Sequence, residues 1–310
     1  MSDTMASLRR QIRGAGDLQS VVRTMKALAA SNIGQYEQSV HALAEYARTV
    51  ELGLRVCFRE GPPMPSIGTH QRHTGATPVG AVVFGSDQGL VGQFNEVIAD
   101  YAVKTLAALP GQPRVMAVGE RVQARLTDAG LQLVEFFPVP NSVKAITPLV
   151  GQILLESDAH GNLEEFAELH LFYNSPTSRT RYAPVTQRLL PLDETWRSEL
   201  ATLPWPTGNL PEIMGSATAT LRSLIHEYLF ISLFRACAES LAGENASRLA
   251  AMQRAEKNID ELLENLNRRY HQLRQRSIDE ELFDVISGFE ALAKVTNSPG
   301  PHESEPGIES

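Results

Sequence analysis

Cysteine is scarce in this sequence, and the two cysteines present, Cys57 and Cys237, are far apart. They form no CxxC pair, so the sequence favours neither a disulfide framework nor a zinc site. We expect both side chains to fill apolar core. The eight histidines include no HExxH motif and no close pair on a predicted helix face. The sequence therefore predicts no metal centre.

Long hydrophobic runs and excess positive charge are also missing. A membrane-spanning helix needs about 20 consecutive apolar residues, and the longest candidate, Leu229 to Phe234, ends at Arg235. The N-terminus has no hydrophobic segment typical of a signal peptide. The formal net charge of −8 disfavours a nucleic-acid partner. We therefore expect a soluble, intracellular protein that binds no nucleic acid.

A heptad-like pattern fills the first 60 residues. Its seam positions are Leu18, Val22, Met25, Ala29, Asn32, Tyr36, Val40, Leu43, Ala47, Val50 and Leu54. Steps of three and four alternate, with one extra step of four between Tyr36 and Val40. This pattern predicts a long helix over 1–60 that winds around a partner and has a single stutter. The glycine and prolines of 61–78 predict a linker.

The middle of the chain, 79–192, has a different rhythm. Apolar runs over 79–85, 114–119, 131–137, 168–173 and 182–190 are typical of strands. Helical patterns lie between them, over 91–109, 120–129 and 147–155. Alternating strands and helices with short connections predict an α/β domain with a largely parallel sheet. Three prolines within 193–217 indicate a connector.

A second long helix is predicted over 218–293. Its seam positions are Met252, Ile259, Leu263, Leu266, Tyr270 and Leu273. Because each terminal helix has an apolar stripe to cover, we expect the two to pair antiparallel. The predicted fold class is α/β, with an antiparallel coiled coil of long N- and C-terminal helices and an inserted Rossmann-like α/β domain. The prolines, glycines and glutamates of 294–310 predict a disordered acidic tail.

The glycines at Gly85, Gly89 and Gly92 follow a predicted strand and precede a predicted helix, a place where nucleotide folds bind phosphate. Their spacing matches neither GxGxxG nor the P-loop, and no Gly-Lys pair occurs in the chain. A tight turn that needs glycine backbone freedom explains them more simply. Ser86 and Asp87 have no nearby base in the sequence, so no catalytic residue and no cofactor are predicted.

Several segments together resemble one family. They are Leu8–Ile12 (LRRQI), Val22–Ser31 (VRTMKALAAS), Gly85–Asn95 (GSDQGLVGQFN), Leu241–Met252 (LAGENASRLAAM), Arg274–Ile278 (RQRSI) and Ser287–Gly288. In this order they resemble the signatures of ATP synthase gamma subunits, from about Ser7 to Leu292. The chain resembles a divergent member, since Phe289 and Glu290 stand where small residues are usual.

The resemblance implies a non-catalytic rotor, the central-stalk gamma subunit of an F-type ATP synthase. Its partners would be the alpha and beta subunits of the catalytic ring, the epsilon subunit and the c-subunit ring, through which it would reach the membrane. By resemblance, Met25 and Lys26 would contact beta subunits, as would Arg274 and Gln275. The basic residues between Ser7 and Gln35, which exceed the acidic ones by four, would suit an acidic partner surface. The implied location is the cytoplasmic side of a bacterial inner membrane.

Three alternatives remain open at this stage. The chain could serve an accessory ATPase that pumps sodium ions or protons. It could be a coiled-coil scaffold unrelated to ATPases, or an enzyme that uses the turn over 85–92 to hold a nucleotide.

Overall fold

The computed structural model describes residues 4–60, 79–159, 168–178, 181–192, 194–202, 204–209 and 211–296. The predicted linker over 61–78 lies outside these residues, as does the predicted tail from 297 to 310. The tail was predicted to begin at 294, but 294–296 belong to the last helix of the chain. The elements are α1 (Met5–Glu60), β1 (Val79–Phe84), α2 (Phe94–Ala107), β2 (Pro113–Val118), α3 (Glu120–Asp128), β3 (Gln132–Phe137), α4 (Val143–Ala159), β4 (Glu168–Ser178), β5 (Arg181–Leu190), α6 (Glu194–Ala201) and α7 (Ala217–Thr296).

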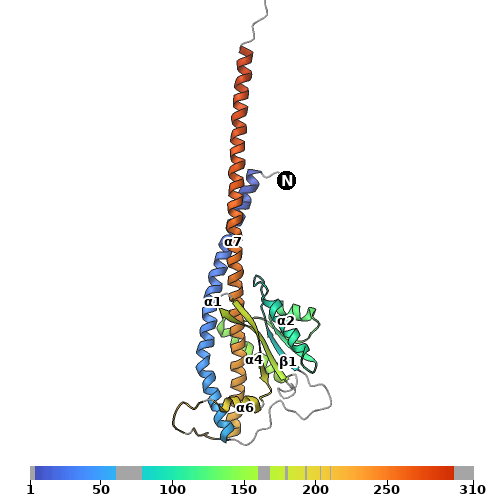
Figure 1. Ribbon diagram of the computed structural model, residues 1–310, viewed down its shortest axis with the longest axis vertical. Coiled ribbons are helices and arrows are strands. Elements are labelled where there is room, and N and C mark those ends of the chain that lie inside the picture. The colour runs from blue at the N-terminus through green and yellow to red at the C-terminus, as the bar shows by residue number, and fades with distance from the viewer. Residues whose placement is uncertain are drawn as a thin grey trace, which may run out of the picture. The chain divides into compact units, whose positions relative to one another are not determined.

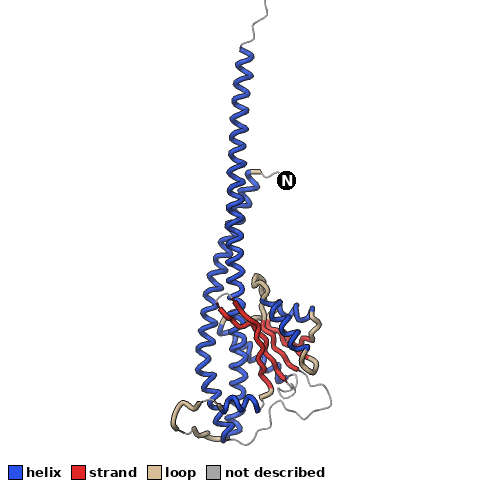
Figure 2. The backbone as a smooth tube through the Cα atoms, viewed as in Figure 1, coloured by secondary structure: helices blue, strands red, loops and turns tan. Residues whose placement is uncertain are grey.

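The chain forms two compact units, and each long terminal helix contributes to both. One unit consists of Met1–Val22 and Ala255–Ser310, and the other of Arg23–Arg254. Figure 1 labels the elements in chain order, and Figure 2 colours them by type.

A regular seam runs along the whole of α1. The buried and half-buried positions of α1 include Leu8, Ile12, Ala15, Gln19, Val22, Lys26, Ala29, Ile33, Tyr36, Val40, Leu43, Ala47, Val50, Leu54 and Cys57. These positions alternate in steps of four and three without interruption, as in an ideal heptad. The helix is therefore specified by its apolar stripe, despite the glycines within it.

Two details of the predicted seam are wrong. Leu18 is 59% exposed, and its place is taken by Gln19, whose side-chain amide donates to the Asp260 carboxylate. The predicted stutter before Val40 disappears, because the buried residue in the preceding turn is Ile33 and the half-buried Asn32 lies beside it. At Leu18 an apolar side chain beside the seam accounts for the wrong register, whereas at Asn32 the neighbouring Ile33 is the more deeply buried residue.

Within the first unit, α1 and α7 pair antiparallel. Leu8 and Ala15 share a core with Leu266. Near the start of α1, the Arg9 Nε donates to the Tyr270 hydroxyl at 2.8 Å. The predicted seam of α7 is confirmed in this unit, because Ile259, Leu263, Tyr270 and Leu273 are half-buried and Leu266 is buried.

Within the second unit the same two helices also run antiparallel. Asn32 of α1 donates its side-chain amide to Asn245 of α7 at 3.3 Å. Further along α1, the Tyr46 hydroxyl donates to Glu227 at 3.0 Å, a residue that comes earlier in α7. The paired terminal helices of the predicted fold class are thus confirmed.

The inserted domain is a five-stranded mixed sheet in the order β3-β2-β1-β4-β5. Strand β1 pairs in parallel with β2 and β4, and β3 pairs in parallel with β2, while β5 runs antiparallel to β4 at one edge. Every residue of the central strand β1 is buried, as expected for a strand covered on both faces. The predicted α/β class with a largely parallel sheet is confirmed.

The two faces of this sheet carry different helices. Alternate residues of β1 point to opposite sides. Val82 and Phe84 join a core with α4 and with the parts of α1 and α7 in this unit, whereas Ala81 and Val83 join a core with α2 and α3. Figure 1 shows α2 and α4 on either side of the strands. The sheet therefore rests directly on the helix pair.

Two helices begin elsewhere than predicted. Helix α2 begins at Phe94 and not at Val91, because Leu90 and Gly92 have positive φ angles of 63° and 58°, which a right-handed helix excludes. Helix α4 begins four residues earlier than predicted, at Val143, and encloses Pro148. Pro148 cannot donate the helical hydrogen bond to Lys144, yet the helix continues through it.

The predicted connector over 193–217 contains a helix, α6, that the sequence pattern did not predict. Trp196 in α6 stacks edge-on against Phe58 of α1, with ring centroids 5.5 Å apart, and lies 5.1 Å from the Tyr228 ring of α7. The Arg197 guanidinium lies over the Phe58 ring at 4.9 Å. This cluster orders the segment, because its partners come from both long helices.

Candidate functional site

The turn between β1 and α2 is held by its own side chains. Ser86 donates its backbone N–H to Asn95 Oδ1 at 2.9 Å, and Asn95 Nδ2 donates to Ser86 Oγ at 2.8 Å. A Cβ on Gly85 would lie 2.7 Å from Asn95 Oδ1 and would also collide with Val122. Close packing therefore accounts for Gly85, and a positive φ of 58° accounts for Gly92. The backbone N–H and the hydroxyl of Ser86 are both engaged within the turn.

Asp87 ties together the loops at the carboxyl ends of three parallel strands. Its Oδ1 accepts the backbone N–H of Glu120, and its Oδ2 accepts that of Val139, both at 2.9 Å. Asp87 itself follows β1, Glu120 follows β2 and Val139 follows β3. One carboxylate thus satisfies donors from two other loops and fixes this edge of the sheet beside α7.

Helix α7 presents a buried polar stretch to this edge. Glu244 is 6% exposed, and Asn245 and Ser247 are comparably buried. Glu244 Oε1 pairs with Arg248 Nη2 at 2.7 Å, one helical turn away. Ser247 donates its hydroxyl to the carbonyl oxygen of Val91. Such buried polar groups are tolerated only where partners are supplied. Here α7 supplies Arg248 and the Leu241 carbonyl, α1 supplies Asn32, and the inserted domain supplies the Val91 carbonyl.

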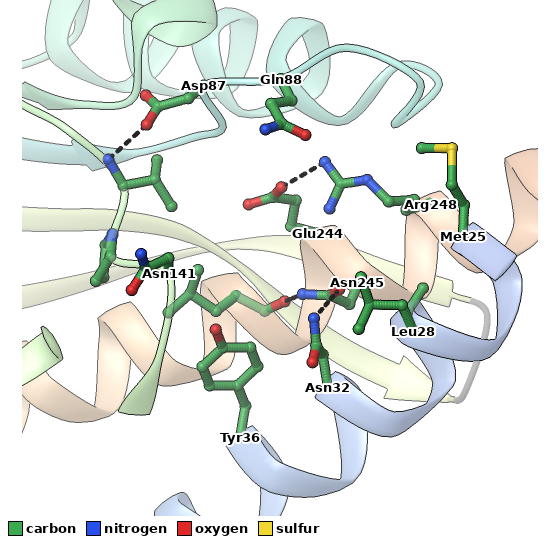
Figure 3. Close-up of a pocket in the computed structure, with 14 residues that line it drawn as sticks. Met25, Leu28, Asn32, Tyr36, Asp87, Gln88, Asn141, Glu244, Asn245 and Arg248 are labelled. Carbon is green, nitrogen blue, oxygen red and sulfur yellow. Dashed lines mark hydrogen bonds and ion pairs between the residues drawn. The ribbon is translucent and has the colours of Figure 1, made fainter. Parts of the chain in front are cut away.

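A cavity of about 300 Å³ lies between α1, α7 and the loops after β1 and β3. Figure 3 shows its lining residues, with Glu244 and Arg248 reaching into it from α7 and Asn32 and Tyr36 from α1. Buried groups form its base, whereas Leu28, Gln88 and Asn141 at its rim are exposed. The cavity therefore combines charged and amide side chains with apolar ones, and it is open to solvent at its edge.

The electrostatics of the cavity centre on Glu244. Burial raises the pKa of its carboxyl, the Arg248 guanidinium opposes that shift, and the negative charge of Asp87 adds to it. The pKa of the Tyr36 phenol is also raised, first by burial and then by Glu244. The cavity is thus lined by two carboxylates, those of Asp87 and Glu244, and by one guanidinium, that of Arg248.

The four contact residues predicted from the sequence fall into two pairs. Met25 and Lys26 are half-buried on α1, and Met25 lines the cavity. Arg274 and Gln275 are exposed on α7 and belong to the other compact unit. Asp87 and Glu244 were not predicted as site residues. An acidic residue directly after a buried strand could have indicated Asp87, whereas nothing local marks Glu244.

Neither a metal-binding group nor a membrane-spanning helix occurs among the residues that the structure describes. No group of three or more His, Cys, Asp and Glu side chains in them could hold a metal ion. None of the described helices combines the length and apolar character of a membrane span. Cys57 and Cys237 are thiols, and both are buried.

Comparison with known proteins extends these observations. A family model described as ATP synthase matches residues 4–292. The "ATP synthase gamma chain" of Rhizobium johnstonii is 27% identical over 302 residues, covering 93% of this chain and 99% of that protein. The "ATP synthase gamma chain" of Syntrophus aciditrophicus is 26% identical over 303 residues, with 94% and 99% covered.

Solved structures share the fold. A chain from the OSCP/F1/c-ring structure of the Euglena gracilis mitochondrial ATP synthase matches with a TM-score of 0.61 at 16% identity, over 97% of this chain and 98% of that one. A chain from the central stalk and c-ring of the Tetrahymena thermophila enzyme matches with a TM-score of 0.53 at 16% identity, over 76% and 99%.

Long terminal helices that pair antiparallel, with a mixed-sheet domain inserted between them in sequence, define a class of helical shaft proteins. Because the family model matches nearly the whole chain, the chain belongs to the ATP synthase gamma-subunit family. The relatives are matched over almost their full length. Membership removes the alternative of a scaffold unrelated to ATPases.

Proposed function

We propose that this chain is the non-catalytic rotor of an F-type ATP synthase. In this role it transmits torque between a membrane ring of c subunits and a catalytic ring of alpha and beta subunits. The observation that carries the proposal is the antiparallel pairing of α1 and α7 in both compact units. Helices of 56 and 80 residues correspond to about 84 and 120 Å of backbone. A shaft of this kind is stiff because each helix covers the apolar stripe of the other.

A non-catalytic role is supported by the turn over 85–92. Gly85 is accounted for by packing and Gly92 by its positive φ. Ser86 donates its hydroxyl to the Gln88 carbonyl within the turn, and Asp87 accepts hydrogen bonds from two neighbouring loops. Nucleotide chemistry would then reside on the partner subunits.

The proposed partners are the alpha, beta and epsilon subunits and the c ring. The chain would be peripheral on the cytoplasmic side of a bacterial inner membrane, held there through the complex. The bacterial origin of the two relatives described above supports this location.

Co-expression tests this proposal. The tagged full chain, produced with the alpha, beta and epsilon subunits of its own organism, should co-purify with them as an ATP-hydrolysing complex. A chain that stays alone after co-expression, while the other subunits assemble without it, would refute the proposal.

The four predicted contact residues are tested in the same complex. Arg274→Ala should lower ATP hydrolysis by at least several-fold, because a guanidinium bond to a partner carboxylate or carbonyl is lost. Arg276→Ala is the matched control, since Arg276 is an exposed arginine on the same turn of α7. Equal activities for the two variants would remove Arg274 from the contact, and Gln275, Met25 and Lys26 can be tested in the same way.

A further inference from the structure

The cavity contains a carboxylate oxygen that has no partner. Glu244 Oε1 pairs with Arg248, but Oε2 is buried and accepts no hydrogen bond from any residue that the structure describes. The Glu244 side chain is 8% exposed and lines the cavity, as Figure 3 shows. A buried carboxylate oxygen without a donor is costly, so an occupant that supplies one would be favoured.

The charge of the lining specifies the sign of that occupant. Asp87 and Glu244 each contribute a negative charge and Arg248 a positive one, so the three leave one negative charge uncompensated. Asp87 already accepts two backbone N–H groups, which leaves Glu244 as the better acceptor. Around it stand amide and hydroxyl groups from Asn32 and Tyr36.

We propose that this cavity is a binding site for a cationic N–H donor, an ammonium or guanidinium group, with Glu244 Oε2 as its principal acceptor. The space of about 300 Å³ accommodates such a head and its alkyl stem, and Met25 and Leu28 supply apolar contact for the stem. The head comes either from a lysine or arginine of a neighbouring subunit or from a small free amine. Both sources share the same chemistry at Glu244.

Ethylammonium titrated into the full chain tests the site directly. Side-chain amide signals of Asn32 and Asn245, followed by NMR, should shift and saturate with a Kd of about 1 mM or weaker, the range expected for so small a ligand. Tetramethylammonium at equal ionic strength has the charge but no N–H, and should leave them unchanged. Equal shifts with both salts would overturn the proposal.

Two substitutions in the cavity and one control outside it test the site further, so that a folding defect in one variant does not decide the result. Glu244→Gln removes the charged acceptor and should weaken ethylammonium binding about tenfold or more. Asn32→Lys places a tethered ammonium in the cavity, so it should abolish binding and raise the melting temperature. Gln35→Lys, an exposed position on the same helix, adds the same charge outside the cavity and should preserve binding. Unchanged binding in Asn32→Lys would overturn the proposal.

The assembled complex distinguishes the two sources. If a lysine or arginine of another subunit fills the cavity, the complex should no longer bind ethylammonium although the free chain does. If the complex binds it as well as the free chain, the occupant is a free amine. The titration of the free chain does not depend on assembly, so it can fail or succeed separately from the proposed rotor function.

Discussion

At Gly243, α7 lies close against the inserted domain. A Cβ placed on Gly243 would lie 2.6 Å from the backbone carbonyl oxygen of Asn174 in β4, far inside a normal contact. Asn174 is fully buried and donates its side-chain amide to the Phe94 carbonyl at 3.0 Å, so β4 cannot move away freely. Gly243→Ala must therefore shift either the helix or the strand.

The size of the effect follows from two opposing terms. Replacing a helical glycine by alanine stabilises a helix by about 1 kcal/mol, whereas overpacking costs about 1–3 kcal/mol and more where backbone must move. We expect Gly243→Ala to lower the free energy of unfolding by about 1–2 kcal/mol. The matched control is Gly34→Ala on α1, where a Cβ meets nothing within 4 Å, and which should stabilise by about 0.5–1 kcal/mol.

Urea unfolding monitored by tryptophan fluorescence measures both variants. The chain has two tryptophans, Trp196 and Trp205, and both lie in the unit that contains Gly34 and Gly243. The midpoint should fall for Gly243→Ala and rise for Gly34→Ala. If both variants are stabilised equally, the close approach between α7 and β4 is wrong.

Three further predictions use the same preparation. Asp87→Asn should cost about 1.5–3 kcal/mol, because the amide keeps only one acceptor oxygen for two backbone donors; an unchanged urea midpoint would contradict this. Burial raises the pKa of Tyr173 to about 12, with a further contribution from Glu239 and an opposing one from Arg235. Above pH 10 the unfolded chain loses this proton before the folded chain does, so stability should fall between pH 10 and 12, and less steeply in Tyr173→Phe. Burial also raises the pKa of the Cys237 thiol, so iodoacetamide at pH 8 should modify it only in urea; rapid reaction of the native chain would argue against its burial.

Much of the fold could be predicted because its signals are local. The uninterrupted apolar run from Val79 specifies a strand buried on both faces, and β1 occupies Val79–Phe84. The seam of α7 was also readable from spacing alone, since Ile259, Leu263 and Leu266 recur at helical intervals. Both patterns depend only on neighbours in the sequence.

The missed elements depend on partners that are distant in sequence. Helix α6 has few apolar residues and lies among prolines, and its order comes from Trp196 contacting Phe58 and Tyr228. Strand β4 extends to Ser178 beyond its predicted end at Tyr173, because Ser175 and Pro176 pair with residues of β5. Locally such residues favour a turn, and only the antiparallel partner makes them a strand.

The site was predictable only in part, for the same reason. Met25 was singled out by resemblance and does line the cavity. In the sequence, Glu244 is only part of the segment Leu241–Met252 that resembles the family. Its environment is formed by α1, α7 and two loops of the inserted domain. The spacing of residues in the sequence does not indicate that Glu244 lines the same cavity as Asp87 and Asn32.

The polar stretch of α7 explains why the helix pair and the sheet form one core in this part of the chain. A helix that faces only a coiled-coil partner would carry apolar residues along its seam, yet Ser240, Glu244 and Ser247 are buried here. These residues face a second neighbour, because Ser247 bonds the Val91 carbonyl and Gly243 lies against β4. Helix α7 is thus packed against α1 on one side and against the domain on another. Since packed interiors transmit displacement and do not absorb it, we expect a force on the α/β domain to reach both helices at this level.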